Sequence, residues 1–297
     1  LDSSEYEKGL KDAKSSAGGL SGLLSKVGSV TSTVGKGIFA VAENVVKVSA
    51  AATTAGAAAV SALTTLAVNS YEDYEQLVGG VETLYKDSAA KVQQYAADAY
   101  KTSGMTANEY MTTATSYAAA LVSSLGGDTE QAAELSNMAV SDMADNWNKF
   151  GSSADSVQDA YNGFAKGQFQ LLDNLKLGYG GTKQEMQRLL DDANKLNAAQ
   201  GKYTDYSIDS FSDIILAIHD IQTEYDITGT TAKEASTTIS GSLSAAKAAW
   251  ANLVTGVADD NANFGQLISN FVDSATTAAS NIIPRIEVAL DGAAELI

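Results

Sequence analysis

A glycine-rich stretch, GYGGTKQEM at residues 178–186, has the residue types of a phosphate-binding loop. The backbone amides of such a loop, with a lysine and a hydroxyl side chain, bind the phosphates of a nucleotide. The P-loop pattern requires G-x-x-x-x-G-K-[ST] after a strand, whereas Lys183 directly follows Thr182 and the preceding FQLLDNLKL has a helical pattern. The dinucleotide pattern G-x-G-x-x-G also fails, because Lys183 replaces its last glycine. The sequence therefore predicts a joint between two helices and no cofactor.

The chain has a single histidine, His219, and no cysteine. Disulfides, thiolate nucleophiles and multi-histidine metal sites are therefore excluded for this sequence. His219 precedes Asp220, but a Ser-His-Asp arrangement needs a nucleophile turn such as G-x-S-x-G, which the sequence lacks. The 36 acidic residues could include the carboxylate pair of a glycosidase, yet no cleft motif singles out a pair. We expect His219 to hydrogen-bond a carbonyl or carboxylate, and we predict no catalytic residue.

A polar cluster in SDMADNWNKFG holds Asp142, Asp145, Asn146 and Asn148 near an expected helix end. Carboxylates and amides are ligands for calcium, but the EF-hand spacing is absent and no glutamate closes a loop. Asp142, Asp145 and Asn146 have i, i+3, i+4 spacing and share one helix face. We interpret them as a solvated polar face that caps helices and makes an inter-helix hydrogen bond, and we predict no metal site.

The elements that carry these residues are expected to be helices throughout. The sequence contains one proline, Pro284, and proline costs about 3 kcal/mol inside a helix, so long helices are permitted. Apolar residues recur every three or four positions, most strongly at Phe211, Ile214, Ile215, Ile218, Ile221 and Tyr225. Helices with one apolar face must pack on one another. We predict an all-α fold, an amphipathic multi-helix domain joined to long alanine-rich apolar helices.

We divide the chain into three regions. Residues 1–70 are expected to form an amino-terminal helical segment with an uncharged alanine-rich helix. Residues 71–258 are expected to form a compact all-helical domain. Residues 259–297 are expected to form a long helix that continues beyond the sequence given.

One capping device recurs at the expected turns. A threonine or aspartate followed three residues later by glutamate or glutamine forms a capping box, in which each side chain accepts from a backbone amide of the other. A glycine just upstream suits the left-handed residue that ends the preceding helix. The four instances are Gly104/Thr106/Glu109, Gly126/Asp128/Gln131, Gly180/Thr182/Glu185 and Gly229/Thr231/Glu234.

No residue between Lys47 and Glu72 is charged, so residues 48–71 are long enough to span a bilayer. The segment is mostly alanine, threonine and serine, and small residues let helices approach closely. We favour a packed helix in a bundle or homo-oligomer, and a conditional membrane segment is the alternative. A constitutive transmembrane helix is least expected, because aromatic and basic anchors are poor.

Charge is unevenly spread over the chain. Residues 1–70 hold six lysines and five acidic residues, whereas residues 71–297 hold 13 basic and 31 acidic residues, a net charge of −18. Nucleic-acid binding requires lysine and arginine at the phosphates. Specific nucleic-acid binding by residues 71–297 is therefore not expected.

Six segments, in this order, resemble phage tail tape-measure proteins of the type found in Firmicutes bacteria. They are YEDYEQLVGGVETLY (71–85), GMTANEYM (104–111), DMADNWNKFG (142–151), AYNGFAKGQFQLLDNLKLGYGGTKQEMQRLL (160–190), AIHDIQ (217–222) and ITGTTAKEASTTISGSLSAAKAAWANL (227–253). The resemblance covers about 70–253, and Trp147 departs from it where a small residue is expected.

The resemblance implies a structural protein of a phage tail or a phage-tail-like particle. Such a protein lies in the lumen of the tail tube, sets tail length as a tape measure and takes part in genome ejection. Implied partners are the tail tube protein, tail-tip and assembly-chaperone proteins and further copies of the chain, with a trimer expected. The implied locations are the virion tail, the host cytoplasm during assembly and, through residues 48–71, the host membrane. No catalytic residue is implied, and the alternative is a helical pore-forming or membrane-acting protein.

Overall fold

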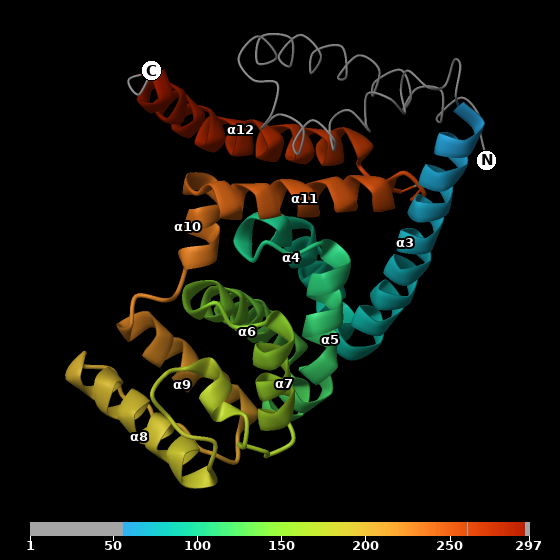
Figure 1. The fold of residues 1–297 in the computed structure, drawn as a ribbon. Helices are drawn as coiled ribbons and strands as arrows, with labels where there is room; N and C mark the ends of the chain where they lie inside the picture. Colours follow the sequence, from blue (N-terminus) through green and yellow to red (C-terminus); the bar gives the residue numbers. More distant parts are fainter. Residues whose placement is uncertain (1–55, 260, 295–297) are drawn as a thin grey trace. The chain divides into compact units, whose positions relative to one another are not determined.

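The computed structural model describes residues 56–259 and 261–294, and all of their regular elements are helices (Figure 1). The predicted all-α fold is confirmed for this part of the chain. The elements are α3 (Gly56–Tyr85), η1 (Lys86–Ser88), α4 (Ala89–Thr102), α5 (Ala107–Ser124), α6 (Thr129–Phe150), α7 (Ala154–Phe164), η2 (Leu172–Leu175), α8 (Lys183–Ala199), α9 (Phe211–Glu224), α10 (Thr230–Thr237), α11 (Ile239–Gly256) and α12 (Phe264–Ala294), where η marks a 3-10 helix.

The described residues form two compact units. One contains residues 56–73 and 249–276, and the other contains Tyr74–Ala248 and residues 277–294. The predicted region 1–70 lies largely outside the described residues, and α12, with 31 residues, accounts for most of the predicted region 259–297. The second unit holds all the residues considered above for chemistry.

Helix α6 lies at the centre of the Tyr74–Ala248 segment, because it contacts α4, α5, α7, α9 and α10. The apolar stripes point inward as their spacing predicts, and on α9 Ile214, Ile215 and Ile218 are almost completely buried. Tyr225 is an exception: the helix ends at Glu224, and the Tyr225 side chain is half exposed. The core therefore surrounds α6, the helix that carries the polar residues Asp142, Asp145 and Asn146 of the DMADN sequence (142–146).

Three of the predicted N-caps form within their own segments, at Thr106, Asp128 and Thr182. Thr106 Oγ1 accepts from the amide of Glu109 at 3.1 Å, and the Glu109 carboxylate accepts from the amide of Thr106 at 2.8 Å. Asp128 accepts from two amides in the first turn of α6. Gly104 and Gly126 have φ of 69° and 64°, as expected for left-handed residues after a helix. These short-range contacts determine where α5 and α6 begin.

The predicted uncharged segment 48–71 is described from residue 56 onward, as the first half of α3. Among residues 56–259 and 261–294, no helix is both long and apolar enough to cross a membrane. The described part of the segment is rich in alanine, serine and threonine, and acidic residues follow it at Glu72 and Asp73. The membrane-spanning candidate is therefore not found in the described part, and residues 48–55 lie outside it.

Candidate functional site: a buried polar cluster on helix α6

Asp142, Asp145 and Asn146 lie on one face of α6, as their spacing predicts, and the predicted inter-helix hydrogen bonds are present. The prediction of a solvated face is wrong, because all three residues are buried, with exposed fractions of 0 to 2%. They are buried because α9, α10 and the η2 segment each place a hydrogen-bonding group against this face. A buried carboxylate needs such partners to offset the loss of its hydration.

Asp142 pairs with His219 of α9. The Nδ1 atom of His219 lies 3.0 and 2.9 Å from the two carboxylate oxygens, so the prediction of a carboxylate partner is confirmed. Burial raises the pKa of Asp142 to about 6, although the hydrogen bond from His219 partly opposes this shift. The hydrogen bond to Asp142 raises the pKa of His219, and burial partly opposes that shift. The folded pair therefore binds protons more tightly than the unfolded chain.

The sign of the resulting pH dependence follows from both shifts. The raised pKa of Asp142 contributes stability that is complete below its ordinary value of 3.8 and is lost as the pH rises through about 6. The raised pKa of His219 contributes stability that is complete below 6.5 and is lost at higher pH. Both groups therefore make the fold less stable as the pH rises.

Asp145 caps α10 across the interface between α6 and α10. Its carboxylate accepts from the amides of Gly229 at 2.6 Å and Thr231 at 2.7 Å. The predicted capping box at this position is wrong, because Gly229 with φ of 82° occupies the N-cap position and provides no side chain. Glu234, the predicted partner of Thr231, instead accepts from Asn148 Nδ2 at 3.0 Å. A carboxylate about 85 positions earlier in the chain thus replaces the local cap.

Asn146 of α6 hydrogen-bonds the segment that precedes the glycine-rich stretch. Its Nδ2 atom donates to the carbonyl oxygen of Leu175 at 2.9 Å, at the end of η2. The sequence FQLLDNLKL was predicted to be helical, and only the short 3-10 helix Leu172–Leu175 forms there. Lys176 ends it in the left-handed conformation, with φ of 54°.

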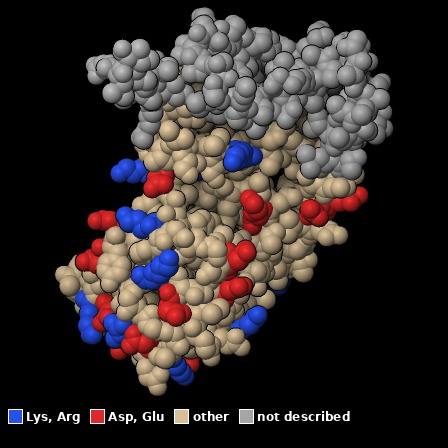
Figure 2. Space-filling view, in the orientation of Figure 1, with Lys and Arg blue, Asp and Glu red and all other residues tan. Residues whose placement is uncertain are grey.

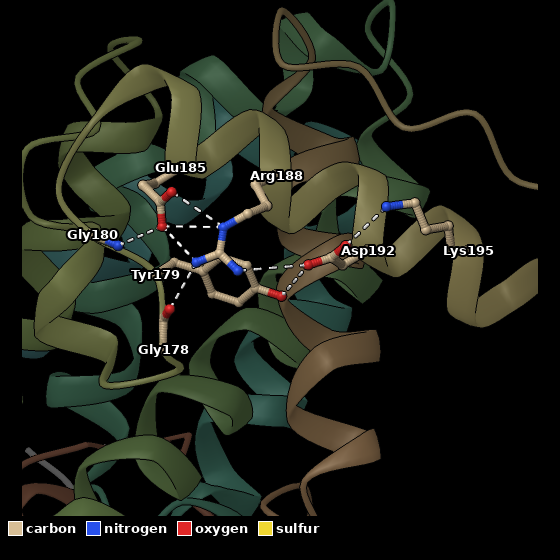
Figure 3. A network of polar contacts seen from close by, with 7 residues as sticks. All are labelled: Gly178, Tyr179, Gly180, Glu185, Arg188, Asp192 and Lys195. Atoms are coloured by element: carbon tan, nitrogen blue, oxygen red, sulfur yellow. Dashed lines mark hydrogen bonds and ion pairs between the residues drawn. The ribbon is translucent and has the colours of Figure 1, made fainter.

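Hydrogen bonds and ion pairs hold the glycine-rich stretch against α8 (Figure 3). Arg188 donates to the carbonyl oxygen of Gly178 at 2.8 Å, pairs with Glu185 at 2.5 Å, and lies over the Tyr179 ring at 4.3 Å. The hydroxyl of Tyr179 donates to Asp192 at 3.2 Å. These interactions place the turn against the first three turns of α8.

Three of the amides that a phosphate loop would offer, those of Gly180, Thr182 and Glu185, are used within the turn. Thr182 Oγ1 accepts from the amide of Glu185 at 3.2 Å, as the capping box predicts. The Glu185 carboxylate, however, accepts from the amide of Gly180 at 3.1 Å, and the amide of Thr182 donates to the Gly180 carbonyl. Gly178, not Gly180 or Gly181, has the positive φ, of 85°. Gly181 is required for another reason, because a Cβ atom there would overlap the backbone carbonyl of Gln170.

Asp220, the neighbour of His219, belongs to a separate network. Its carboxylate accepts from Asn197 Nδ2 at 2.6 Å and from the Tyr206 hydroxyl at 2.8 Å, which ties the end of α8 and the following loop to α9. In the part of the chain described, no serine or threonine hydroxyl is hydrogen-bonded to His219. No group of three or more histidine, aspartate or glutamate side chains within the same residues is placed to hold a metal ion.

Sequence reasoning did not single out two further buried side chains with polar groups, those of Tyr161 and Gln222. Gln222 is fully buried on α9, and a polar residue directly after Ile221 in an apolar stripe was the available signal. Tyr161 is also fully buried and carried no signal, because tyrosine is common in helix cores.

Comparison of the chain with known protein families, with curated proteins and with solved structures finds no match.

Proposed function

We propose that this chain is part of a tape-measure protein, a structural protein of a phage tail or phage-tail-like particle that has no enzymatic role. The observation that carries the proposal is the order of the six tape-measure-like segments within residues 71–253. They fall in succession on α3, α5, α6, α7 to α8, α9, and α10 to α11.

The contacts made by these segments support an architectural role. The DMADN segment contributes Asp142 and Asp145, which join α6 to α9 and α10. The GYGG segment contributes Gly181, at a close approach between two backbone stretches. The residues that make these segments distinctive therefore connect helices to one another.

The charge of this chain is consistent with a protein that DNA moves past without binding to it. Residues 71–297 carry a net charge of −18, and on the face shown in Figure 2 lysine and arginine side chains lie among acidic ones. A surface of this kind offers phosphates little replacement for their counterions. We further propose the lumen or tip of the virion tail as its place. The proposed partners are the tail tube protein, tail-tip and assembly-chaperone proteins and two further copies of the chain.

Tail length tests the proposal. In the particle that encodes this chain, an in-frame deletion of α12 (31 residues) should shorten the tail, by about 47 Å if each residue contributes a helical rise. Duplication of α12 should lengthen the tail by the same amount. Tail lengths would be measured by electron microscopy, with an Asp159→Ala variant as the control of unchanged length.

Two results would overturn the proposal. One is unchanged tail length in particles that contain the shortened and the lengthened chains. The other is mass spectrometry of purified wild-type tails that detects the tube protein but not this chain.

A further inference from the structure

Four side chains, on α6, α7, α9 and α10, hold buried polar atoms that no group of the described chain hydrogen-bonds. The atoms are Asn146 Oδ1, Tyr161 OH, Gln222 Nε2 and Oε1, and Thr231 Oγ1. A buried polar atom without a partner costs about 1–3 kcal/mol, and such atoms are rare in native proteins. Several of them on the helices around one buried ion pair call for a common explanation.

The contacts between α6 and α9 place Asn146 and Gln222 near each other. The contacts follow the chain in the same direction on both sides. Asp142 of α6 bonds His219 of α9, and Asp145, three residues later, bonds Gly229, ten residues after His219. Asn146 lies four residues after Asp142, and Gln222 lies three residues after His219 on the neighbouring helix. Residues three or four apart share a helix face, so Asn146 and Gln222 lie one turn beyond the ion pair on facing sides of α6 and α9.

Tyr161 and Thr231 carry the remaining two unpartnered groups of this set, both hydroxyls, on two further helices. Tyr161 projects from α7, which packs on α6, and the charges of Asp142 and Asp145 add to burial in raising the pKa of its hydroxyl. Thr231 begins α10, where its amide donates to Asp145. Tyr161 therefore lies near both carboxylates, and Thr231 lies beside Asp145.

The chemistry of the atoms identifies the occupant. Gln222 Nε2 can only donate, Asn146 Oδ1 and Gln222 Oε1 can only accept, and the two hydroxyls can do both. A metal cation could satisfy the acceptors but would leave the amide donor unpaired. A water molecule donates and accepts, and buried water typically makes about three hydrogen bonds to such groups.

We propose that α6, α7 and α9 enclose a binding site for ordered water molecules between Asn146, Tyr161 and Gln222. The bound water completes the hydrogen bonding of the side chains of Asn146, Tyr161 and Gln222. The inference concerns the folded chain alone and stands independently of the proposed tail function.

Oxygen-17 magnetic relaxation dispersion of the full chain tests this site, because it counts internal water molecules with long residence times. The Gln222→Met variant keeps the side-chain length and removes both amide atoms. It should lose at least one long-lived water molecule per chain relative to wild type. Gln187→Met, at an exposed position of α8, is the matched control and should lose none. If Gln222→Met does not fold, Tyr161→Phe, which removes one oxygen atom, should give the same loss.

Three results would overturn the proposal. The first is a wild-type chain without long-lived internal water. The second is an unchanged count in a folded Gln222→Met or Tyr161→Phe variant. The third is a count that changes when sodium is replaced by choline, because that would identify a cation as the occupant.

Discussion

Replacement of Asp145 by alanine would remove the distant cap of α10. The carboxylate accepts two backbone amides at 2.6 and 2.7 Å, and hydrogen bonds to a charged group contribute about 1.5–3 kcal/mol each. Gly229 is exposed, so water can replace part of what its amide loses. We therefore expect the low end of the range for both bonds, and a fall of about 3 kcal/mol in the free energy of unfolding.

Two measurements would follow the loss. Urea unfolding would be monitored by Trp147 fluorescence in a Trp250→Phe background, so that the signal reports the unit that contains α6. Hydrogen exchange would show the location, since α10 has only one buried residue, Ala235, and depends on caps more than on packing. Exchange at residues 229–237 should accelerate in Asp145→Ala, while exchange in α5 should change only as far as global stability changes.

The control is Asp159→Ala, which removes an exposed carboxylate from α7 and should change stability by less than about 0.5 kcal/mol. Asp145→Asn should lie between the wild type and Asp145→Ala, because its amide oxygen can still accept from one of the two amides. Equal stabilities for the variants at 145 and 159, or unchanged exchange across α10, would refute the assignment of Asp145 as the cap.

Three further outcomes are expected. The free energy of unfolding should fall as the pH is raised from 5 to 8, since the Asp142–His219 pair gains protons on folding; in urea melts, an Asp142→Asn/His219→Gln variant should show a shallower fall, and an equal slope would contradict the proton uptake. Gly181→Ala should destabilise by about 1–3 kcal/mol in thermal unfolding, because its Cβ would overlap a backbone carbonyl, whereas Gly180→Ala, with ordinary contact distances, should cost clearly less. Thr106→Ala should lower the free energy of unfolding in urea by about 1 kcal/mol, because the cap of α5 is lost. A change near zero would show that this cap does not stabilise α5.

Much of the fold could be predicted because the relevant interactions are short-range. The scarcity of proline and the three-to-four-residue apolar spacing predict helices, and the described residues form them. The caps at Thr106 and Asp128 are predictable for the same reason, since donor and acceptor lie within three residues. The i, i+3, i+4 spacing likewise placed Asp142, Asp145 and Asn146 on one face.

Only the tertiary structure decided what those three residues contact. The partners lie between 29 and 86 positions away along the chain, so no local pattern distinguishes a buried contact from a solvated face. The same holds at α10, where Thr231 had the local pattern of a cap and a carboxylate from α6 took the role. Gly181, first considered as part of a nucleotide loop, is required because a distant carbonyl passes beside it. Hydrogen bonding within one helical turn is determined by the sequence itself, whereas burial and close approach depend on which helices pack together.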